Sequence, residues 1–206
     1  VGHHGSRYSS SQELLQAVRP ETAIISVGDN SYGHPTQEAM DRLSQAGAAS
    51  AAVRLTPGTV SLPLAGQVRV LEDASGAMSL ADVKHRAADF RPVSDIGGGA
   101  INFGYTPSVW WLRLDFEAQP ASPREWLLEV AFPTLDSVEY FGPGGEQLRT
   151  GDRLPFAARP LAHRNFVFPV SLAEAGTGSA WLRIASEGTV TVPLHLWQAE
   201  AFWRES

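Results

Sequence analysis

From about residue 67 onward the chain alternates apolar and polar residues with a period of two. In residues 110–117 every even position is apolar, and three of the four odd positions are charged. Residues 126–132 repeat the pattern, and further strands are expected at 136–141, 165–170, 180–186 and 190–197. A period of two places alternate side chains on opposite faces of a strand. Many short strands separated by Gly and Pro predict an antiparallel β-sandwich or barrel, with one short helix at 79–88.

Residues 1–62 have a different pattern. A Ser-x-x-Glu capping box precedes apolar residues at helical spacing, and the β-branched run 22–27 predicts a buried strand. A second helix is expected from Pro35, followed by a hairpin formed by 53–55 and 60–62. We therefore predict a short α/β fragment at 1–62 before the β-sandwich.

Composition excludes several classes of protein. The chain has 206 residues, a net charge of −6, 43% hydrophobic residues and no cysteine. Disulfides and thiolate metal sites are excluded, and the acidic balance argues against a surface built for nucleic-acid phosphates. No apolar run is long enough to span a membrane, and no signal-peptide pattern is present in this chain.

Three histidines lie in two loops near the start of the chain. His3 and His4 belong to a Gly-His-His-Gly-Ser run, and His34 precedes Pro35. Loops on either side of a strand and a helix can offer imidazole ligands to Zn²⁺. The alternative is that His34 caps a helix and the other two lie in a frayed terminus. Spacing alone leaves both open.

The same segment resembles a known family. The His-His-Gly-Ser run, the Arg-Pro before the strand, the Ser-Val-Gly turn and the Asn-x-Tyr-x-His-Pro loop resemble the end of the metallo-β-lactamase-like domain of ComEC-family DNA-uptake channel proteins. The resemblance implies that His3 or His4, and more weakly His34, belongs to a metal site that hydrolyses phosphodiesters. The family's main motif, His-x-His-x-Asp-His, is absent from this chain. We therefore expect no catalytic residues and no cofactor here, with Zn bound only if the missing motif is supplied elsewhere. A fragment of a nuclease associated with competence is the alternative function.

The strands predict a second kind of site. Three of them place a Trp two residues from a cation or an imidazole, on the face opposite the apolar one. An aromatic ring can stack on the C–H face of a sugar, while neighbouring polar groups bond its hydroxyls. With one loop arginine added, the predicted ligand-binding residues are Trp111, Arg113, Arg159, Trp181, Arg183, His195 and Trp197. The alternatives are that the Trp rings pack on Arg or beneath a loop, and that Arg159 ties loops together through backbone carbonyls. A second protomer could also cover the face.

Residues 68–203 are also similar to a known family, and the β-sandwich domain is predicted to span 68–204. The segments LEDASGAMSLADV, FRPV, NFGYTPSVWWLRLDF and WLRIAS resemble the type-two extracellular domain of 7TMR-DISM receptors. The resemblance implies a jelly-roll sandwich on the periplasmic or extracellular face of a bacterial inner membrane, similar to carbohydrate-binding modules. Such a module would sense a small carbohydrate or glycan for a signalling receptor and would bind no nucleic acid. The family's membrane domain is absent from this chain.

Overall fold

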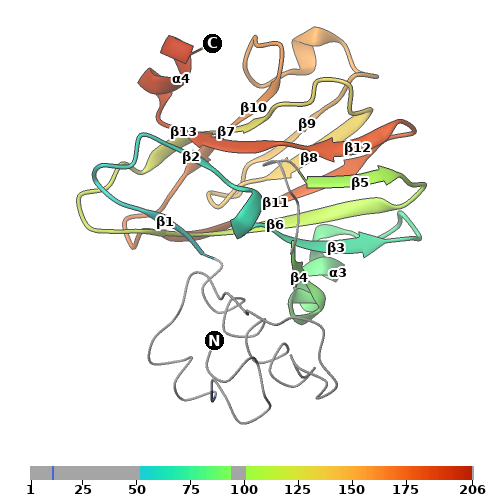
Figure 1. Ribbon diagram of the computed structural model, residues 1–206, viewed down its shortest axis with the longest axis horizontal. Coiled ribbons are helices and arrows are strands. Elements are labelled where there is room, and N and C mark those ends of the chain that lie inside the picture. Colours follow the sequence, from blue (N-terminus) through green and yellow to red (C-terminus); the bar gives the residue numbers. More distant parts are fainter. Residues whose placement is uncertain (1–10, 12–51, 94–100, 206) are drawn as a thin grey trace, which may run out of the picture. The chain divides into compact units, whose positions relative to one another are not determined.

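The computed structural model describes residue 11, residues 52–93 and residues 101–205 (Figure 1). By its internal contacts the chain divides into Val1–Ala51 and Ala52–Ser206, and the fold below is that of the second unit. The predicted helices and strand before residue 51 lie outside the described residues, as do His3, His4 and His34.

The second unit is mainly β, as predicted, with two large sheets. The first sheet has the order β4-β3-β6-β11-β8-β9, and β1 pairs with β6 as a further strand. Its strands are β1 (Ala52–Leu55), β3 (Arg69–Asp73), β4 (Arg91–Pro92), β6 (Val109–Ala118), β8 (Ser137–Phe141), β9 (Gln147–Thr150) and β11 (Thr177–Ala185). All its pairings are antiparallel except that of β1 with β6. We call it the seven-stranded sheet.

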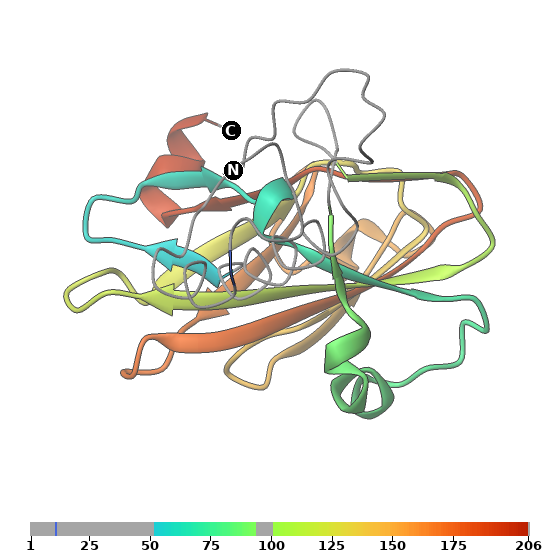
Figure 2. The same cartoon turned by 60° about the horizontal axis from the view of Figure 1, so that its bottom comes forward.

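The second large sheet has four strands in the order β10-β7-β13-β2. They are β2 (Ser61–Pro63), β7 (Glu125–Val130), β10 (Phe166–Ser171) and β13 (Leu194–Trp197). A separate pair consists of β5 (Ile101–Tyr105) and β12 (Thr189–Val192). The helices are α3 (Leu80–His85), α4 (Ala199–Glu205) and the 3-10 turns η2 (Ala65–Gln67), η3 (Ala87–Asp89) and η4 (Phe156–Ala158). Figure 2 shows α3, in green, at the bottom of the turned view, beside the seven-stranded sheet.

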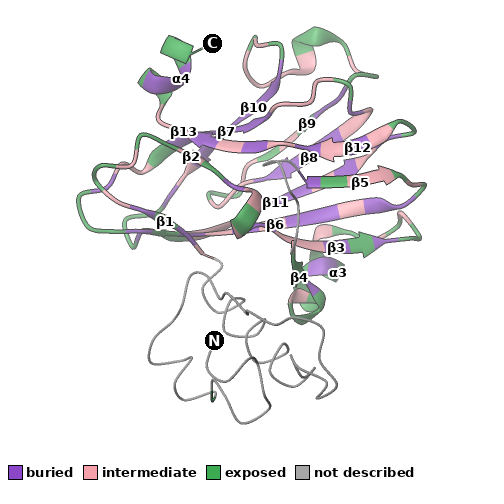
Figure 3. Cartoon of the chain, viewed as in Figure 1, coloured by how far each residue is buried: buried purple, intermediate pink, exposed green. Residues whose placement is uncertain are grey.

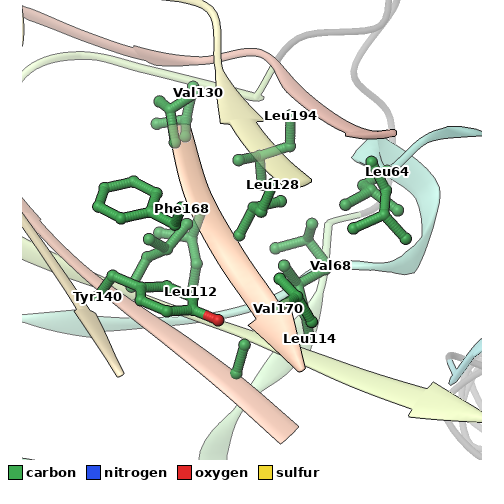
Figure 4. Packing of buried hydrophobic residues seen from close by; sticks show 14 of the residues in the cluster. Leu64, Val68, Leu112, Leu114, Leu128, Val130, Tyr140, Phe168, Val170 and Leu194 are labelled. Atoms are coloured by element: carbon green, nitrogen blue, oxygen red, sulfur yellow. The ribbon is translucent and has the colours of Figure 1, made fainter. Parts of the chain in front are cut away.

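The main core lies between the inward faces of the two large sheets (Figure 4). Leu112 and Leu114 of β6 are almost fully buried, as are Leu128 and Val130 of β7. The alternation predicted from the sequence is therefore confirmed for these strands. Tyr140 joins the sheets, because its ring stacks on Phe168 at 4.9 Å and its hydroxyl donates to the carbonyl oxygen of Pro169 at 2.8 Å.

The start of the sandwich lies earlier than predicted. Residues 53–55 and 60–62 do not form a hairpin, because β1 pairs in parallel with β6 while β2 pairs with β13 in the other sheet. Val53, Leu55 and Leu64 have no exposed surface and belong to the main core. By internal contacts these residues therefore belong to the second unit, which begins at Ala52. An apolar strand in a sequence does not say which distant strand it will pair with.

Proline interrupts or borders several strands. Pro193 separates β12 from β13, so the single strand predicted at 190–197 is two strands in different sheets. Pro63, Pro92 and Pro169 lie in β2, β4 and β10, each at the end of a sheet's strand order. A proline has no backbone N–H, and it is tolerated in sheets mainly on edge strands.

Candidate functional site

Four of the seven predicted ligand-binding residues form one block on the outer face of the seven-stranded sheet. In the register of β6 and β11, Trp181 lies opposite Arg113, and Arg183 lies opposite Trp111. Directly opposed residues on paired strands have neighbouring side chains. Each tryptophan of the block is therefore paired across the strands with an arginine.

The expectation that this face is bare is wrong. Trp111 is 1% exposed and Trp181 is 6% exposed, because both pack in one apolar cluster with Val83 of α3, and Met78 and Leu80 pack against this cluster. Figure 3 shows buried stretches, in purple, along β6 and in α3. A capping box between Ser79 and Asp82 starts α3, and Val83 buries its side chain in the same apolar cluster. The two tryptophans thus belong to a second, smaller core, which we call the outer cluster: Leu71, Val83, Phe90, Val109, Trp111, Phe141 and Trp181.

Arg183 binds the segment before α3, residues 73–79, to the seven-stranded sheet. Its guanidinium donates to Glu139 Oε1 at 2.9 Å and to the carbonyl oxygen of Gly76 at 2.7 Å. Asp73, at the start of the same segment, accepts hydrogen bonds from the backbone N–H of Ser75, Gly76 and Met78. Burial would raise the pKa of Asp73, but a hydrogen bond from the Ser75 hydroxyl at 2.6 Å and then the three backbone bonds lower it below its ordinary value. The segment from 73 to 79 is therefore held in one conformation.

Arg113 lies at the border between the outer cluster and open space. Its guanidinium carbon is 5.1 Å from the centre of the Trp181 ring, within the range of a cation–π interaction. Its Nε donates to Asp115 Oδ1 at 2.9 Å, and the hydroxyl of Ser179 donates to the same oxygen at 2.6 Å. On its other side lies Arg69, whose pKa is lowered by burial and then by the charge of Arg113.

A cleft of about 510 Å³ opens beside this pair, and we call it the Arg113–Trp181 cleft. Its polar lining comes from α3, β6, β11 and the turn between β8 and β9, where the backbone N–H of Gly142 donates to the Glu146 carbonyl at 2.9 Å. Trp181 and Phe141 form its aromatic floor, and its polar side chains are Lys84, Arg113, Glu146, Gln147 and Ser179. The volume is within the range of about 300–1,000 Å³ typical of ligand pockets.

His195 and Trp197 lie elsewhere, on β13 of the four-stranded sheet. The Trp197 Nε1–H donates to Glu129 Oε2 at 2.9 Å, and Asn165 donates to the other carboxylate oxygen at 2.6 Å. The rings of His195 and Trp197 stack at 4.1 Å, and Phe202 of α4 packs edge-on against Trp197. The prediction of one surface shared by the three indoles is therefore wrong. Burial lowers the pKa of His195, and the charge of Glu129 opposes this shift.

Arg159 adopts the structural role that was one of its two predicted alternatives. Its Nη1 donates to the carbonyl oxygens of His163, at 2.9 Å, and of Arg164. The guanidinium also lies over the rings of Phe156 and Phe166, at 5.1 and 4.7 Å. Arg159 thereby ties together the connection that precedes β10.

The sequence did not reveal a larger cleft, of about 730 Å³, lined by Tyr105, Asp136, Arg149, Arg153 and Glu187 among others. We call it the loop cleft. Tyr105 is 82% exposed, although its strand ends in a run of alternating residues. The local sequence signal for this exposure is Gly104, because a glycine inside a strand often marks a bulge. In the structure Gly104 has a φ of 67°.

In the part of the chain that the structure describes, no group of three or more His, Cys, Asp or Glu side chains is arranged to hold a metal ion. No helix among these residues is long and apolar enough to cross a bilayer. The histidines predicted as metal ligands are outside this part.

Two packed, mainly antiparallel sheets, with clefts on one outer face and at one end, define the unit as a β-sandwich module. Comparison with known families makes this specific. Residues 65–198 match the family described as 7TMR-DISM extracellular 2, and the chain belongs to this family. The resemblance inferred from the sequence is thus confirmed.

The resemblance to competence proteins is also confirmed. The chain is 48% identical to ComE operon protein 3 of Bacillus subtilis over 46 residues, which are 22% of this chain and 6% of that protein. It is 41% identical to Recombination protein 2 of Haemophilus influenzae over 71 residues, 34% of this chain and 8% of that protein. It is 50% identical to Competence protein ComA of Neisseria gonorrhoeae over 44 residues, 21% of this chain and 6% of that protein. The chain therefore spans less than a tenth of each of these relatives.

Proposed function

We propose that the β-sandwich is the periplasmic or extracellular ligand-sensing module of a bacterial signalling receptor, and that its ligand is a carbohydrate. Membership of an extracellular domain family supports the sensing role. The Arg113–Trp181 cleft carries the proposal of a carbohydrate, because five polar side chains surround an aromatic floor in a space of ligand size.

The charges in the cleft favour a neutral sugar. Arg113 is paired with Asp115 at 2.9 Å, so its charge is already balanced within the protein. The two other charged lining residues, Lys84 and Glu146, are opposite in sign, so the cleft has no net charge. Gln147 and Ser179 offer groups that can both donate and accept, which suits hydroxyls. Trp181 exposes too little surface to stack fully on a sugar, since its ring is covered by Arg113 on one side. We therefore expect hydrogen bonds to dominate recognition.

The test is a glycan array followed by calorimetric titration of the full chain with neutral oligosaccharides. Gln147→Ala and Ser179→Ala should each weaken binding about two- to tenfold, which corresponds to one hydrogen bond of about 0.5–1.5 kcal/mol. Gln119, which is exposed and does not line the cleft, supplies the matched control, and Gln119→Ala should bind normally. Neutral sugars that fail to bind, or that bind all variants equally, would contradict the proposal.

The alternative function, a nuclease fragment associated with competence, predicts a different result from the same preparation. DNA cleavage stimulated by Zn²⁺ or Mn²⁺, and lost in the variants His3→Ala and His4→Ala, would favour it.

A further inference from the structure

The loop cleft lies at one end of the sandwich, where four connections meet. Its lining comes from the connections β5–β6, β7–β8, β9–β10 and β11–β12 and from the strand ends beside them. None of the seven residues predicted from the sequence lines it. It is also separate from the Arg113–Trp181 cleft, since the two share no lining residue.

Asp136 fixes three of these connections to one another. Its Oδ2 accepts from the backbone N–H of Glu187 at 2.7 Å, and its Oδ1 lies 3.6 Å from Nε of Arg153. Arg153 also pairs with the carboxylate of Glu187. Beside them, the backbone N–H of Asp152 donates to the carbonyl oxygen of Leu135 at 2.7 Å. The walls of the cleft are therefore built before any ligand arrives, which lowers the entropic cost of binding.

The backbone at Gly151 shows how closely these walls approach. A Cβ atom at this position would lie 2.1 Å from the carbonyl oxygen of Asp136. Only glycine allows the two connections to lie this close.

A bulge in β5 turns Tyr105 outward. The register between β5 and β12 shifts between Val190 and Thr191, and Phe103 is the extra residue. In a regular strand with no bulge, Tyr105 would lie on the same inward face as the buried Ile101. Phe103 instead stacks on Trp110 at 3.8 Å, and the Tyr105 ring stands in solvent at the cleft.

Arg149 is the cation of the loop cleft that has no carboxylate partner within the described residues. Glu139 lies directly opposite it on β8, but the Glu139 carboxylate is bonded to Arg183 at 2.9 Å. The charge of Arg153 is balanced by Asp136 and Glu187. Arg149 is therefore available to bind an anion, and its planar guanidinium fits a carboxylate with two parallel hydrogen bonds.

We propose that the loop cleft is a second ligand site and that it takes a sugar ring bearing a carboxylate. Tyr105 supplies the flat apolar surface for the C–H face of the ring, and Arg149 binds the carboxylate. Ser137, which lines the same cleft, is available to a hydroxyl. This goes beyond the proposed function, which assigns a neutral sugar to the Arg113–Trp181 cleft.

The test compares glucuronate-containing oligosaccharides with their neutral glucose counterparts, by calorimetric titration of the full chain. The acidic sugar should bind at least about tenfold more tightly at low salt, and the difference should shrink as ionic strength rises. Arg149→Gln should abolish this preference, and Arg149→Lys should retain part of it. Arg91→Gln is the matched control, because Arg91 is exposed on β4 and lies outside the cleft.

Tyr105 provides the second arm of the experiment. Tyr105→Ala should weaken binding of the acidic sugar about two- to tenfold, as expected for a stacked aromatic, and Tyr105→Phe should not. Both positions are exposed, so the variants should fold.

Three outcomes would overturn the inference. Equal binding of acidic and neutral sugars, or no binding of either, excludes a site for a carboxylated sugar. An acidic sugar whose binding responds to Gln147→Ala but not to Arg149→Gln would lie in the first cleft, so the proposed carbohydrate binding would stand and the second site would not. If benzoate binds through Arg149 and glucuronate does not, the loop cleft is not a site for a carboxylated sugar.

Discussion

Replacing Trp181 by alanine tests whether the outer cluster is a core or a binding surface. The side chain is 6% exposed, meets Phe90 edge-on at 5.3 Å and lies beneath the guanidinium of Arg113. Exchange of a buried aromatic residue for alanine costs about 3–5 kcal/mol in unfolding free energy. Because the Arg113–Trp181 cleft lets neighbouring side chains relax into the space, we expect about 3 kcal/mol for Trp181→Ala.

For a unit of this size, that loss should lower the Tm by about 6–12 °C. In guanidinium unfolding, the midpoint should fall while the slope m stays unchanged. Trp203 of α4 is 55% exposed and serves as the control, so Trp203→Ala should change stability by no more than about 0.5 kcal/mol. If Trp181→Ala changes stability by less than about 1 kcal/mol, Trp181 is not a core residue and the packing argument fails.

Three further predictions concern the sandwich itself. Tyr140→Phe should cost about 1–2 kcal/mol in thermal unfolding, because it leaves the buried carbonyl of Pro169 without its donor; an unchanged Tm would show that the bond does not hold the sheets together. Burial lowers the pKa of His195 below its ordinary value of 6.5, so the unfolded chain takes up the proton first and the folded state loses stability as pH falls below about 6.5. His195→Phe keeps an aromatic ring against Trp197 but cannot titrate. The unfolding free energy of the wild type should therefore fall relative to that of the variant between pH 7 and pH 5. A difference that stays constant over this range would refute the argument. A fragment of residues 52–206 should unfold cooperatively, whereas a fragment starting at 67 should not, because it lacks β1, β2 and three core residues; equal stability of the two fragments would contradict the earlier boundary.

The sequence predicts which side chains of a strand share a face, but not what covers that face. In β6 the even positions were correctly assigned to the main core. The alternation also predicts that Trp111 and Trp181 lie on the opposite face, which is confirmed, but it does not predict that this face is covered. Their cover is α3, a helix of six residues with one buried side chain, and so short an element carries little amphipathic signal.

Pairing between distant strands was harder to foresee. His195 and Trp197 have the same spacing of aromatic and basic groups as the block on β6 and β11, yet β13 belongs to the other sheet. Sheet membership depends on contacts that no local pattern encodes. The exposure of Tyr105 depends on a single extra residue in β5, and such a bulge shifts the face of every residue after it.

The prolines at the sheet edges limit how this module can be extended by another chain. An incoming strand must find backbone N–H groups along the edge that it joins. The four-stranded sheet ends at β2 on one side and β10 on the other, and each of these strands lacks a donor at its proline. The seven-stranded sheet has a proline at its β4 end and none in β1 or β9. Within the described residues, β9 is thus an end strand that keeps all its backbone donors, and it carries Arg149. A partner strand would pair with β9, and an anionic ligand in the loop cleft would bind Arg149 of the same strand, so strand addition and ligand occupancy should be thermodynamically coupled.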